Sequence, residues 1–289
     1  MKRFVWLVLF AIVTSTGFAQ SADSVVFMTA NRKAYKLRKA EGYTISTTLF
    51  NSAQTISVIK FSPKHFRLKV VQPGGVATVS EMGKNTRSQF AINACFWAMK
   101  KGVPTAFVKS DGVVLSKAHS SMYPRVNGLV MMYDDHLEIV RSYDMPDYPD
   151  YAGMCDNICS VGPVLIDDGE RVSYKHFFDS TKPVFKRQVP FFTRRHPRSA
   201  IGCDAEGNVY MVVVDGRAKG CADGVSIAQL TDICSWLGLV DAINLDGGGS
   251  STLWCRKHGV INHPSGNKIF DHEGERRVSS SIVVQRRRR

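Results

Sequence analysis

The feature that most constrains the fold is a series of short apolar segments, rich in β-branched and aromatic residues, separated by turn residues. Such segments predict β-strands. The predicted strands cover 25–28, 43–50, 55–61, 66–71, 89–96, 106–108, 113–115, 129–133, 137–140, 164–166, 199–203, 209–214, 242–245 and 281–284. Strand–helix–strand units are few, so we expect an α+β fold. Its sheet should be mixed and largely antiparallel with packed helices, in a single domain.

Two helices have clear sequence signals. Thr78 and Glu81 have the spacing of a capping box, which predicts a short helix after Thr78. Ser226 can cap a second helix, whose apolar residues recur at helical spacing as far as Leu237. Gly238 is suited to end that helix in a left-handed conformation.

The N-terminal segment indicates export. Lys2 and Arg3 precede an apolar run from Phe4 to Val13, and small residues follow, as in a secretory signal peptide. The alternative is a membrane anchor, but the run is shorter than the roughly 20 residues that span a bilayer. We expect cleavage after Ala19 or Gln20, with no further membrane span. The mature protein would then be secreted or periplasmic.

The expected organisation is a signal peptide at 1–20, one domain at 21–285 and a basic tail at 286–289. The domain has a strand-rich part at 21–89 and a motif-bearing part at 90–285. Six of the 13 excess positive charges lie at the two ends of the chain, which leaves +7 for the domain. This moderate charge does not indicate a nucleic-acid partner.

Seven cysteines are present, so at least one is free or pairs with another chain. An oxidising compartment permits disulfides, although a chain of this length can fold without them. Cys155 and Cys159 could form a local disulfide or remain two buried thiols. They lack the second ligand pair that a zinc site needs.

The strongest local signal is Asp246 followed by three glycines and Ser250. Consecutive glycines are costly in chain entropy, and their amides can surround an anion. The alternative is a tight structural turn. We expect the amides of the glycines to form an anion cradle with Asp246 at its rim; the glycines are Gly247, Gly248 and Gly249.

A second Asp, Asp215, ends the apolar segment 209–214, and Arg217 follows it. An Arg can bind phosphate in a bidentate manner, although an Asp–Arg surface pair is equally consistent with the residues. Arg198 and Arg276 are further candidates. Gly162, before Pro163, indicates a close backbone approach or a simple turn.

No metal ligands can be assigned from the sequence. His119, His196 and His263 lack the spacing of metal ligands. The sequence requires no cofactor, and a divalent cation shared by Asp215 and Asp246 stays an open alternative.

In this order, the motifs resemble those of the phosphodiester glycosidase family, which includes the lysosomal uncovering enzyme and exported bacterial members. The resemblance runs from about Phe90 to Val284. The matching segments are 93–97, 160–165, 198–202, 214–217, the helix after Ser226, 244–252 and 275–278. It implies a hydrolase that cleaves an N-acetylglucosamine-like sugar from a phosphodiester-linked glycan or glycolipid.

The resemblance also implies the site residues. Asp246 and Asp215 would be catalytic. Substrate and phosphate would be bound by Asn93, Gly162, Arg198, Arg217, Gly247, Gly248, Gly249, Ser250 and Arg276.

Two departures from the family pattern concern the substrate. Ala94 and Cys95 replace glycines of the family motif, and Trp97 replaces a Phe. The side chains of Ala94 and Cys95 could narrow the approach of the backbone to the sugar. The last motif reads Arg277-Val278-Ser279-Ser280 where the family often has Pro-Val-Ala-Asn. The identity of the sugar and the oligomeric state stay open.

Chemistry at the anomeric carbon commonly uses two carboxylates. Phosphate is a good leaving group, so we expect one carboxylate, Asp246, to matter more than the other. Two alternatives stay open. One is a non-catalytic exported phosphoglycan-binding protein with the same fold. The other is attack on phosphorus by Ser250 or Ser251, which no nearby His in the sequence supports.

Overall fold

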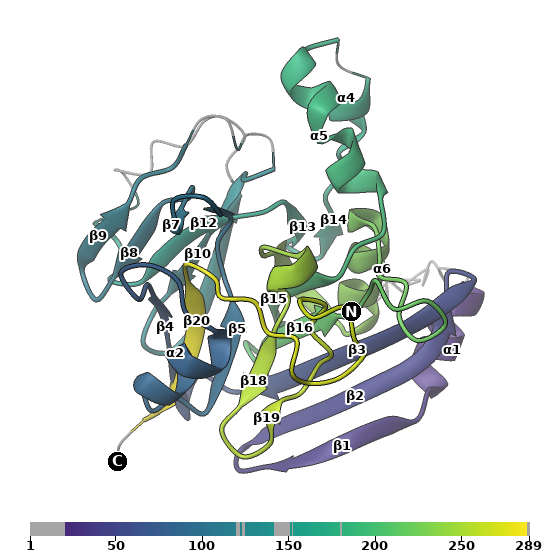
Figure 1. Cartoon of the computed structure of the whole chain (residues 1–289), viewed down its shortest axis with the longest axis horizontal. Helices are drawn as coiled ribbons and strands as arrows, with labels where there is room; N and C mark the ends of the chain where they lie inside the picture. The colour runs from purple at the N-terminus through teal and green to yellow at the C-terminus, as the bar shows by residue number, and fades with distance from the viewer. Residues whose placement is uncertain are drawn as a thin grey trace, which may run out of the picture.

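The computed structural model describes residues 21–287, apart from 120–121, 123–124, 142–150, 152 and 180 and the side chains of 176 and 177. Its strands form one large sheet, two five-stranded sheets and a two-stranded ribbon (Figure 1). Every strand pairing among the described residues is antiparallel. The predicted α+β class is therefore confirmed.

The large sheet has eight strands in the order β1-β2-β3-β16-β15-β17-β13-β14. Its strands are β1 (Arg32–Leu37), β2 (Ala40–Leu49), β3 (Ser52–Phe61), β13 (Val164–Asp167), β14 (Glu170–Arg171), β15 (Arg198–Asp204), β16 (Val209–Val214) and β17 (Leu239–Asn244).

The smaller sheets have the orders β11-β10-β12-β8-β9 and β19-β18-β5-β20-β4, and β6 pairs with β7. Their strands are β4 (Phe66–Val71), β5 (Phe90–Asn93), β6 (Trp97–Ala98), β7 (Val103–Pro104), β8 (Val108–Ser110), β9 (Val113–Ser116), β10 (Gly128–Met132), β11 (Leu137–Arg141), β12 (Ile158–Val161), β18 (Leu253–Cys255), β19 (Gly259–Val260) and β20 (Ser281–Arg286).

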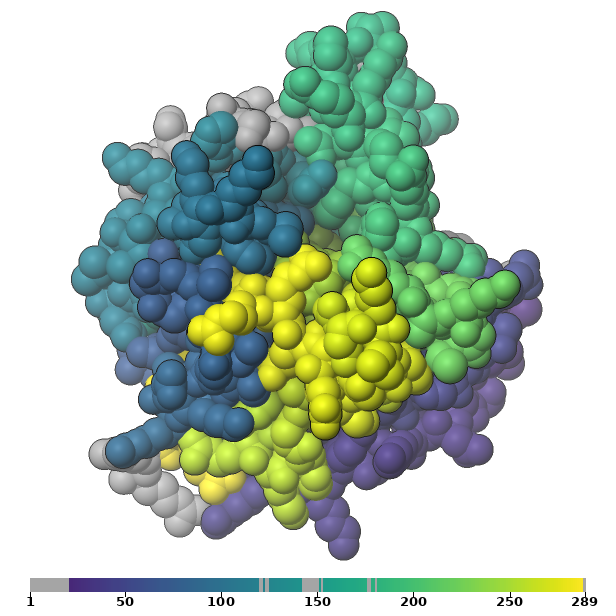
Figure 2. Space-filling view, viewed as in Figure 1, coloured from purple at the N-terminus to yellow at the C-terminus, as the bar shows by residue number. Residues whose placement is uncertain are grey.

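The helices are α1 (Ala22–Thr29), α2 (Val79–Asn85), α4 (Lys175–Phe178), α5 (Pro183–Thr193) and α6 (Ile227–Trp236), with a 3₁₀ turn η2 (Gly248–Ser250). Helices α1, α5 and α6 contribute to the apolar core on one face of the large sheet. The five-stranded sheets enclose a second core on its other face. In Figure 1, α4 and α5 project from the rest of the molecule, and the space-filling view in Figure 2 shows the same projection in teal-green.

Strand β16 shows why the large sheet is covered on both faces. Met211 and Val213 belong to the core shared with the smaller sheets, whereas Val212 and Val214 belong to the core under the helices. Successive side chains of a strand point to opposite faces, so a continuous apolar run such as β16 requires two covered faces.

The topology brings the two carboxylates that are predicted to be catalytic to the same end of the strands of the large sheet. β15 lies between β16 and β17 and pairs antiparallel with both, so β16 and β17 run in the same direction. Asp215 directly follows β16, and Asp246 follows β17 by two residues. Arg198 is the first residue of β15 at this same end of the sheet, and it pairs with Val214.

Both helices with capping signals are confirmed: Thr78 and Ser226 each form a capping box, and Gly238 has a left-handed φ of 80°. The predicted strand at 25–28 is wrong, because these residues lie in α1. There Ser21 accepts a hydrogen bond from Ser24 N, and the Phe27 ring packs 5.5 Å from the Trp236 ring. Tertiary packing therefore outweighs the local β propensity.

The cysteines are all free thiols, and six of the seven are buried. Cys155 Sγ lies 3.1 Å from Met132 O, and the Cys159 thiol contacts Cys95. Of the two alternatives for Cys155 and Cys159, the structure shows two buried thiols. Among the described residues, no helix has both the length and the apolar character needed to cross a bilayer.

Candidate functional site

Asp246 lies at the centre of the site and keeps partial contact with solvent. Its Oδ1 accepts a hydrogen bond from Gly247 N at 2.9 Å, and its carboxylate also interacts with the Ser250 hydroxyl. Burial raises the pKa of Asp246 to about 6, although Ser250, Gly247, Arg276 and Arg125 all favour the ionised form. A carboxylate that titrates near neutrality and reaches solvent has the properties of a catalytic group.

Asn93 fixes the backbone of Asp246. Its Nδ2 donates to Asp246 O at 2.5 Å, and its Oδ1 accepts from Ser199 Oγ at 2.8 Å and Thr252 N at 3.1 Å. Asn93 is 1% exposed, and these bonds join β5, β15 and the glycine turn. Asn93 therefore positions Asp246, and its amide is occupied within the protein.

The glycine turn uses most of its amides internally. Gly247 N donates to Asp246, and Gly248 N donates to Pro197 O at 2.8 Å. Ser250 N donates to Gly247 O at 3.3 Å. Of the three glycine amides, only that of Gly249 makes no hydrogen bond in the described part of the chain. Of the predicted anion cradle, only the Gly249 amide is thus available to bind an anion.

Two arginines lie directly on the glycines. A Cβ added to Gly248 would lie 2.8 Å from Arg217 Nη2, and one added to Gly249 would lie 2.9 Å from Arg276 Nε. The absence of side chains at these glycines lets both guanidinium groups approach the turn. Within the described residues, Arg276 makes no hydrogen bond or salt bridge, so its donors are available for an anion.

The neighbours of Arg276 explain how it is held in place. Glu275 Oε1 accepts from Ser80 N at 3.0 Å, and Arg277 Nη1 donates to Glu81 at 3.0 Å. Both contacts are made at the beginning of α2. The chain is therefore fixed on either side of Arg276, and its guanidinium is directed to Gly249.

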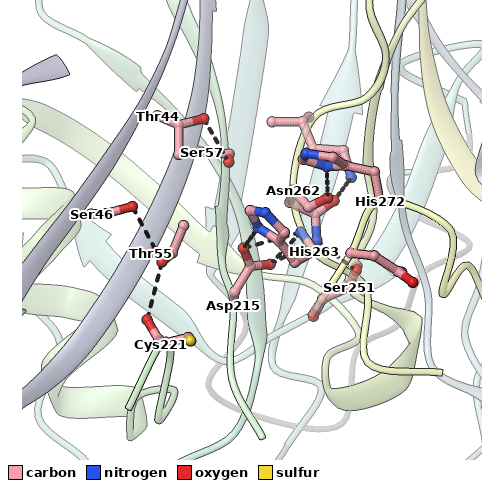
Figure 3. Close-up of polar contacts among 12 residues, drawn as sticks. Thr44, Ser46, Thr55, Ser57, Asp215, Cys221, Ser251, Asn262, His263 and His272 are labelled. Atoms are coloured by element: carbon pink, nitrogen blue, oxygen red, sulfur yellow. Dashed lines mark hydrogen bonds and ion pairs between the residues drawn. The ribbon is translucent and has the colours of Figure 1, made fainter. Parts of the chain in front are cut away.

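Asp215 occupies a different environment from Asp246, and Figure 3 shows its hydrogen bonds to Asn262 and His263. It is 1% exposed and accepts from Asn262 Nδ2 at 2.9 Å and from His263 N at 3.0 Å, while His263 Nδ1 lies 3.0 Å from its Oδ2. The His263 ring stacks on those of Phe270 and His272 at 3.9 and 4.3 Å. Asp215 thus anchors the segment that leads to Arg276, and burial raises its pKa.

Arg198 is 1% exposed, and its guanidinium is engaged by backbone carbonyls. Nε donates to Val225 O at 3.1 Å, and Nη2 donates to Phe191 O at 2.6 Å and Arg194 O at 3.1 Å. Burial, followed by the nearby Arg125, lowers the pKa of Arg198 to about 9. These bonds give Arg198 a structural role at the site.

Sequence reasoning missed Arg125. Its guanidinium lies 4.2 Å from the ring centre of Phe191 and donates through Nη2 to Gln188 Oε1 at 2.7 Å. It also favours the ionised form of Asp246. Gly162 allows this arrangement, because a Cβ there would lie 2.6 Å from Arg125 O, and its φ of 151° favours glycine. A lone Arg in a loop carried no motif that could have revealed it.

The expected narrowing by Ala94 and Cys95 is wrong. Ala94 is 1% exposed and Cys95 is 2% exposed, and both belong to the core between the sheets. Their side chains therefore fill the interior and do not line the surface near Asp246. Among the described residues, no group of three or more His, Cys, Asp or Glu side chains could hold a metal ion.

Gly249→Ala is expected to lower turnover at least about tenfold, because its Cβ would displace the Arg276 guanidinium from the turn. The overall fold should persist. Gly75→Ala is the matched control, since an added Cβ there meets nothing within 4 Å. Steady-state kinetics on both variants test this. Equal activity of the two would show that Arg276 needs no access to Gly249.

The antiparallel α+β fold thus places a partly exposed carboxylate, Asp246, beside two arginines that lie on the glycine turn. The sequence profile of phosphodiester glycosidases matches residues 86–285. This chain therefore belongs to the phosphodiester glycosidase family.

Individual relatives support this. The chain is 26% identical over 234 residues to N-acetylglucosamine-1-phosphodiester alpha-N-acetylglucosaminidase of Bos taurus, covering 74% of this chain and 42% of that protein. It is 27% identical over 179 residues to the SPbeta prophage-derived uncharacterized protein YomE of Bacillus subtilis (strain 168), covering 60% and 25%. The chain thus spans less than half the length of these relatives.

A solved structure has the same fold. It is the zebrafish N-acetylglucosamine-1-phosphodiester alpha-N-acetylglucosaminidase catalytic domain, auto-inhibited by its pro-peptide. The TM-score is 0.69 at 18% identity, and the match covers 89% of this chain and 87% of that chain.

Proposed function

We propose that this chain is a hydrolase that cleaves a sugar from a phosphodiester at the anomeric carbon. The observation that carries the proposal is the partly exposed carboxylate of Asp246, beside the Arg276 guanidinium. This guanidinium lies at Gly249 and makes no hydrogen bond or salt bridge with the described residues. The acid can act at carbon while the arginine binds the phosphate. Membership of the phosphodiester glycosidase family supports cleavage of a sugar from a phosphodiester.

In this mechanism Asp246 acts as nucleophile or as general base at a carbon with oxocarbenium character. The departing phosphate needs its negative charge stabilised more than it needs a proton. Arg276 and Arg217 are placed for that task, with the Gly249 amide as a further donor. Asp215, Asn93 and Arg198 position these groups, so we assign the chemistry to Asp246 alone of the two carboxylates.

The substrate we propose is an N-acetylglucosamine-like sugar on a phosphorylated glycan or glycolipid. Support comes from the names of the bovine and zebrafish relatives, which act on N-acetylglucosamine 1-phosphodiesters. We also propose export, on the signal-peptide pattern of residues 1–20. No metal is assigned a role, and activity is expected to survive a chelator.

The pH dependence of kcat/KM should report Asp246. The reactive form is the carboxylate, so activity should fall about tenfold per pH unit below a limb near the pKa of about 6. If the catalytic Asp had its ordinary pKa, the acid limb of the activity profile would lie about two pH units lower. The measurement is kcat/KM from pH 4 to 8, with circular dichroism as a check on folding. An acid limb near pH 4 in folded protein would contradict the assignment.

The experiment that tests the function uses the chain from residue 21 with an α-N-acetylglucosamine 1-phosphodiester. Free sugar and sugar 1-phosphate are measured separately. Free sugar from the wild type supports glycosidase activity, whereas sugar 1-phosphate would show cleavage at the other phosphate bond. Saturable binding without any product would instead support a phosphoglycan-binding protein.

A further inference from the structure

A second cationic site lies at the far end of the sheet that contains β5. Four arginines line a cleft of about 800 Å³: Arg67, Arg87, Arg286 and Arg287. Among the described residues that line it, Asp134 is the one acidic residue. The described residues that line the cleft therefore carry a net charge of about +3 at neutral pH, because arginine stays protonated.

This cleft is separate from the site at Asp246. Strands β5 and β20 pair so that Ser281 lies opposite Asn93, the residue that fixes Asp246. Arg286 ends β20, five residues beyond Ser281 and opposite Phe66 of β4. Five strand residues span about 17 Å. The arginines thus stand at the opposite end of the strand from the candidate active site. In Figure 1 this end of β20 leads to the C-terminus.

Two of the arginines are fixed by the protein. Arg287 Nε donates to Pro63 O at 3.1 Å and Phe66 O at 3.3 Å, and its buried Nη2 has no partner among the described residues. Arg67 Nε lies 3.2 Å from Asp134 Oδ1. A buried guanidinium nitrogen without an acceptor is unfavourable, so an additional acceptor at this place would stabilise the arrangement.

The other two arginines are exposed. Within the described residues, Arg87 and Arg286 make no side-chain hydrogen bond or salt bridge. Arg87 also has a φ of 54°, in the left-handed region that glycine prefers after a helix. The chain therefore carries an unpaired cation at a position where glycine would be easier to accommodate. Like charges in one cleft repel, and this repulsion is relieved by a bound anion.

We propose that this cleft binds the phosphate groups of an anionic ligand. Guanidinium groups bind phosphate in a bidentate manner, and the cleft has room for more than one phosphate. A polymeric phosphate or phosphoglycan can place several phosphates in it at once, whereas free phosphate places one. This binding does not depend on the proposed hydrolysis, so the two proposals can fail separately.

The test is isothermal titration calorimetry of the chain from residue 21 with two probes, inorganic polyphosphate and orthophosphate. The cleft variant is Arg87→Asn with Arg286→Gln, since Asn tolerates the left-handed conformation. The matched control is Lys39→Asn with Arg38→Gln. Both residues are exposed, and Lys39 has a φ of 62°. Each double variant loses two positive charges.

Polyphosphate should bind the wild type and the control alike, and at least about tenfold more weakly to the cleft variant. Affinity should also fall between about 50 and about 200 mM salt. Loss of orthophosphate binding in the same variant would show that one phosphate suffices, and polyphosphate binding alone would show that several are needed. Equal binding by the cleft and control variants, or no binding to the wild type, would overturn the proposal. Hydrolysis of a small substrate should be unchanged in the cleft variant.

Discussion

Asp246→Asn should reduce turnover by at least about 10³-fold while leaving the fold intact, because Asn keeps the shape but cannot serve as nucleophile or base. The Gly247 amide and the Ser250 hydroxyl can still bond the new side chain. Asp179→Asn is the matched control, since Asp179 is exposed on the α4–α5 connection. Activity within about tenfold of the wild type would remove Asp246 from the chemistry.

The same substitution should raise stability. The folded pKa of Asp246 is about 6 against an ordinary 3.8, so the native state holds its proton more tightly than the unfolded state. Stability therefore falls as pH rises from about 4 to about 6, and the penalty is complete above that range. Asp246→Asn should recover about 1–3 kcal/mol at pH 7 and little at pH 4. Urea unfolding at both pH values measures the difference.

The second large effect is expected at Arg198. Arg198→Ala should destabilise the fold by about 2–4 kcal/mol, because it leaves a cavity and removes the donor to three backbone carbonyls. The cost of burying the charge, seen in its lowered pKa, offsets part of this loss. Arg198→Lys should rescue little, since one ammonium cannot reproduce the planar fork. Exposed Arg38→Ala is the control.

Chemical unfolding and turnover separate the two roles of Arg198. Because the side chain is bonded internally, folded Arg198→Ala at low temperature should retain more activity than Asp246→Asn. A variant with wild-type stability and lost turnover would show that Arg198 contacts the substrate instead. That result would return Arg198 to the phosphate-binding role that the family resemblance implies.

Much of the fold could be predicted from the sequence because local and tertiary preferences agree there. Segments such as 209–214 are apolar throughout and form a strand covered on both faces. The helix after Ser226 has its cap, its spacing and its final glycine in one place. By contrast, α5 contains Pro190 and has no side-chain cap, so Pro183 in its first turn is a weak start signal on its own.

The sequence predicted which residue types form the site, but it did not predict the role of each residue. Asp215 and Asp246 both follow apolar strands, and the sequence favours Asp246 only through its glycine-rich neighbours and the good leaving group. Their difference depends on Asn262 and His263, which enclose Asp215 from a segment 47 and 48 residues away. Arg125 likewise reaches the site through contacts that only the folded chain brings together. Burial, which no motif reports, decides which carboxylate remains accessible.

The central claim is that the bond to the anomeric carbon breaks at Asp246, and oxygen-18 labelling tests it most directly. The substrate is hydrolysed in water enriched in oxygen-18, and the released phosphomonoester is analysed by mass spectrometry. Cleavage at carbon leaves the phosphomonoester unlabelled and places the new oxygen on the sugar, which is the result we predict. A labelled phosphomonoester would show attack at phosphorus and contradict the role assigned to Asp246.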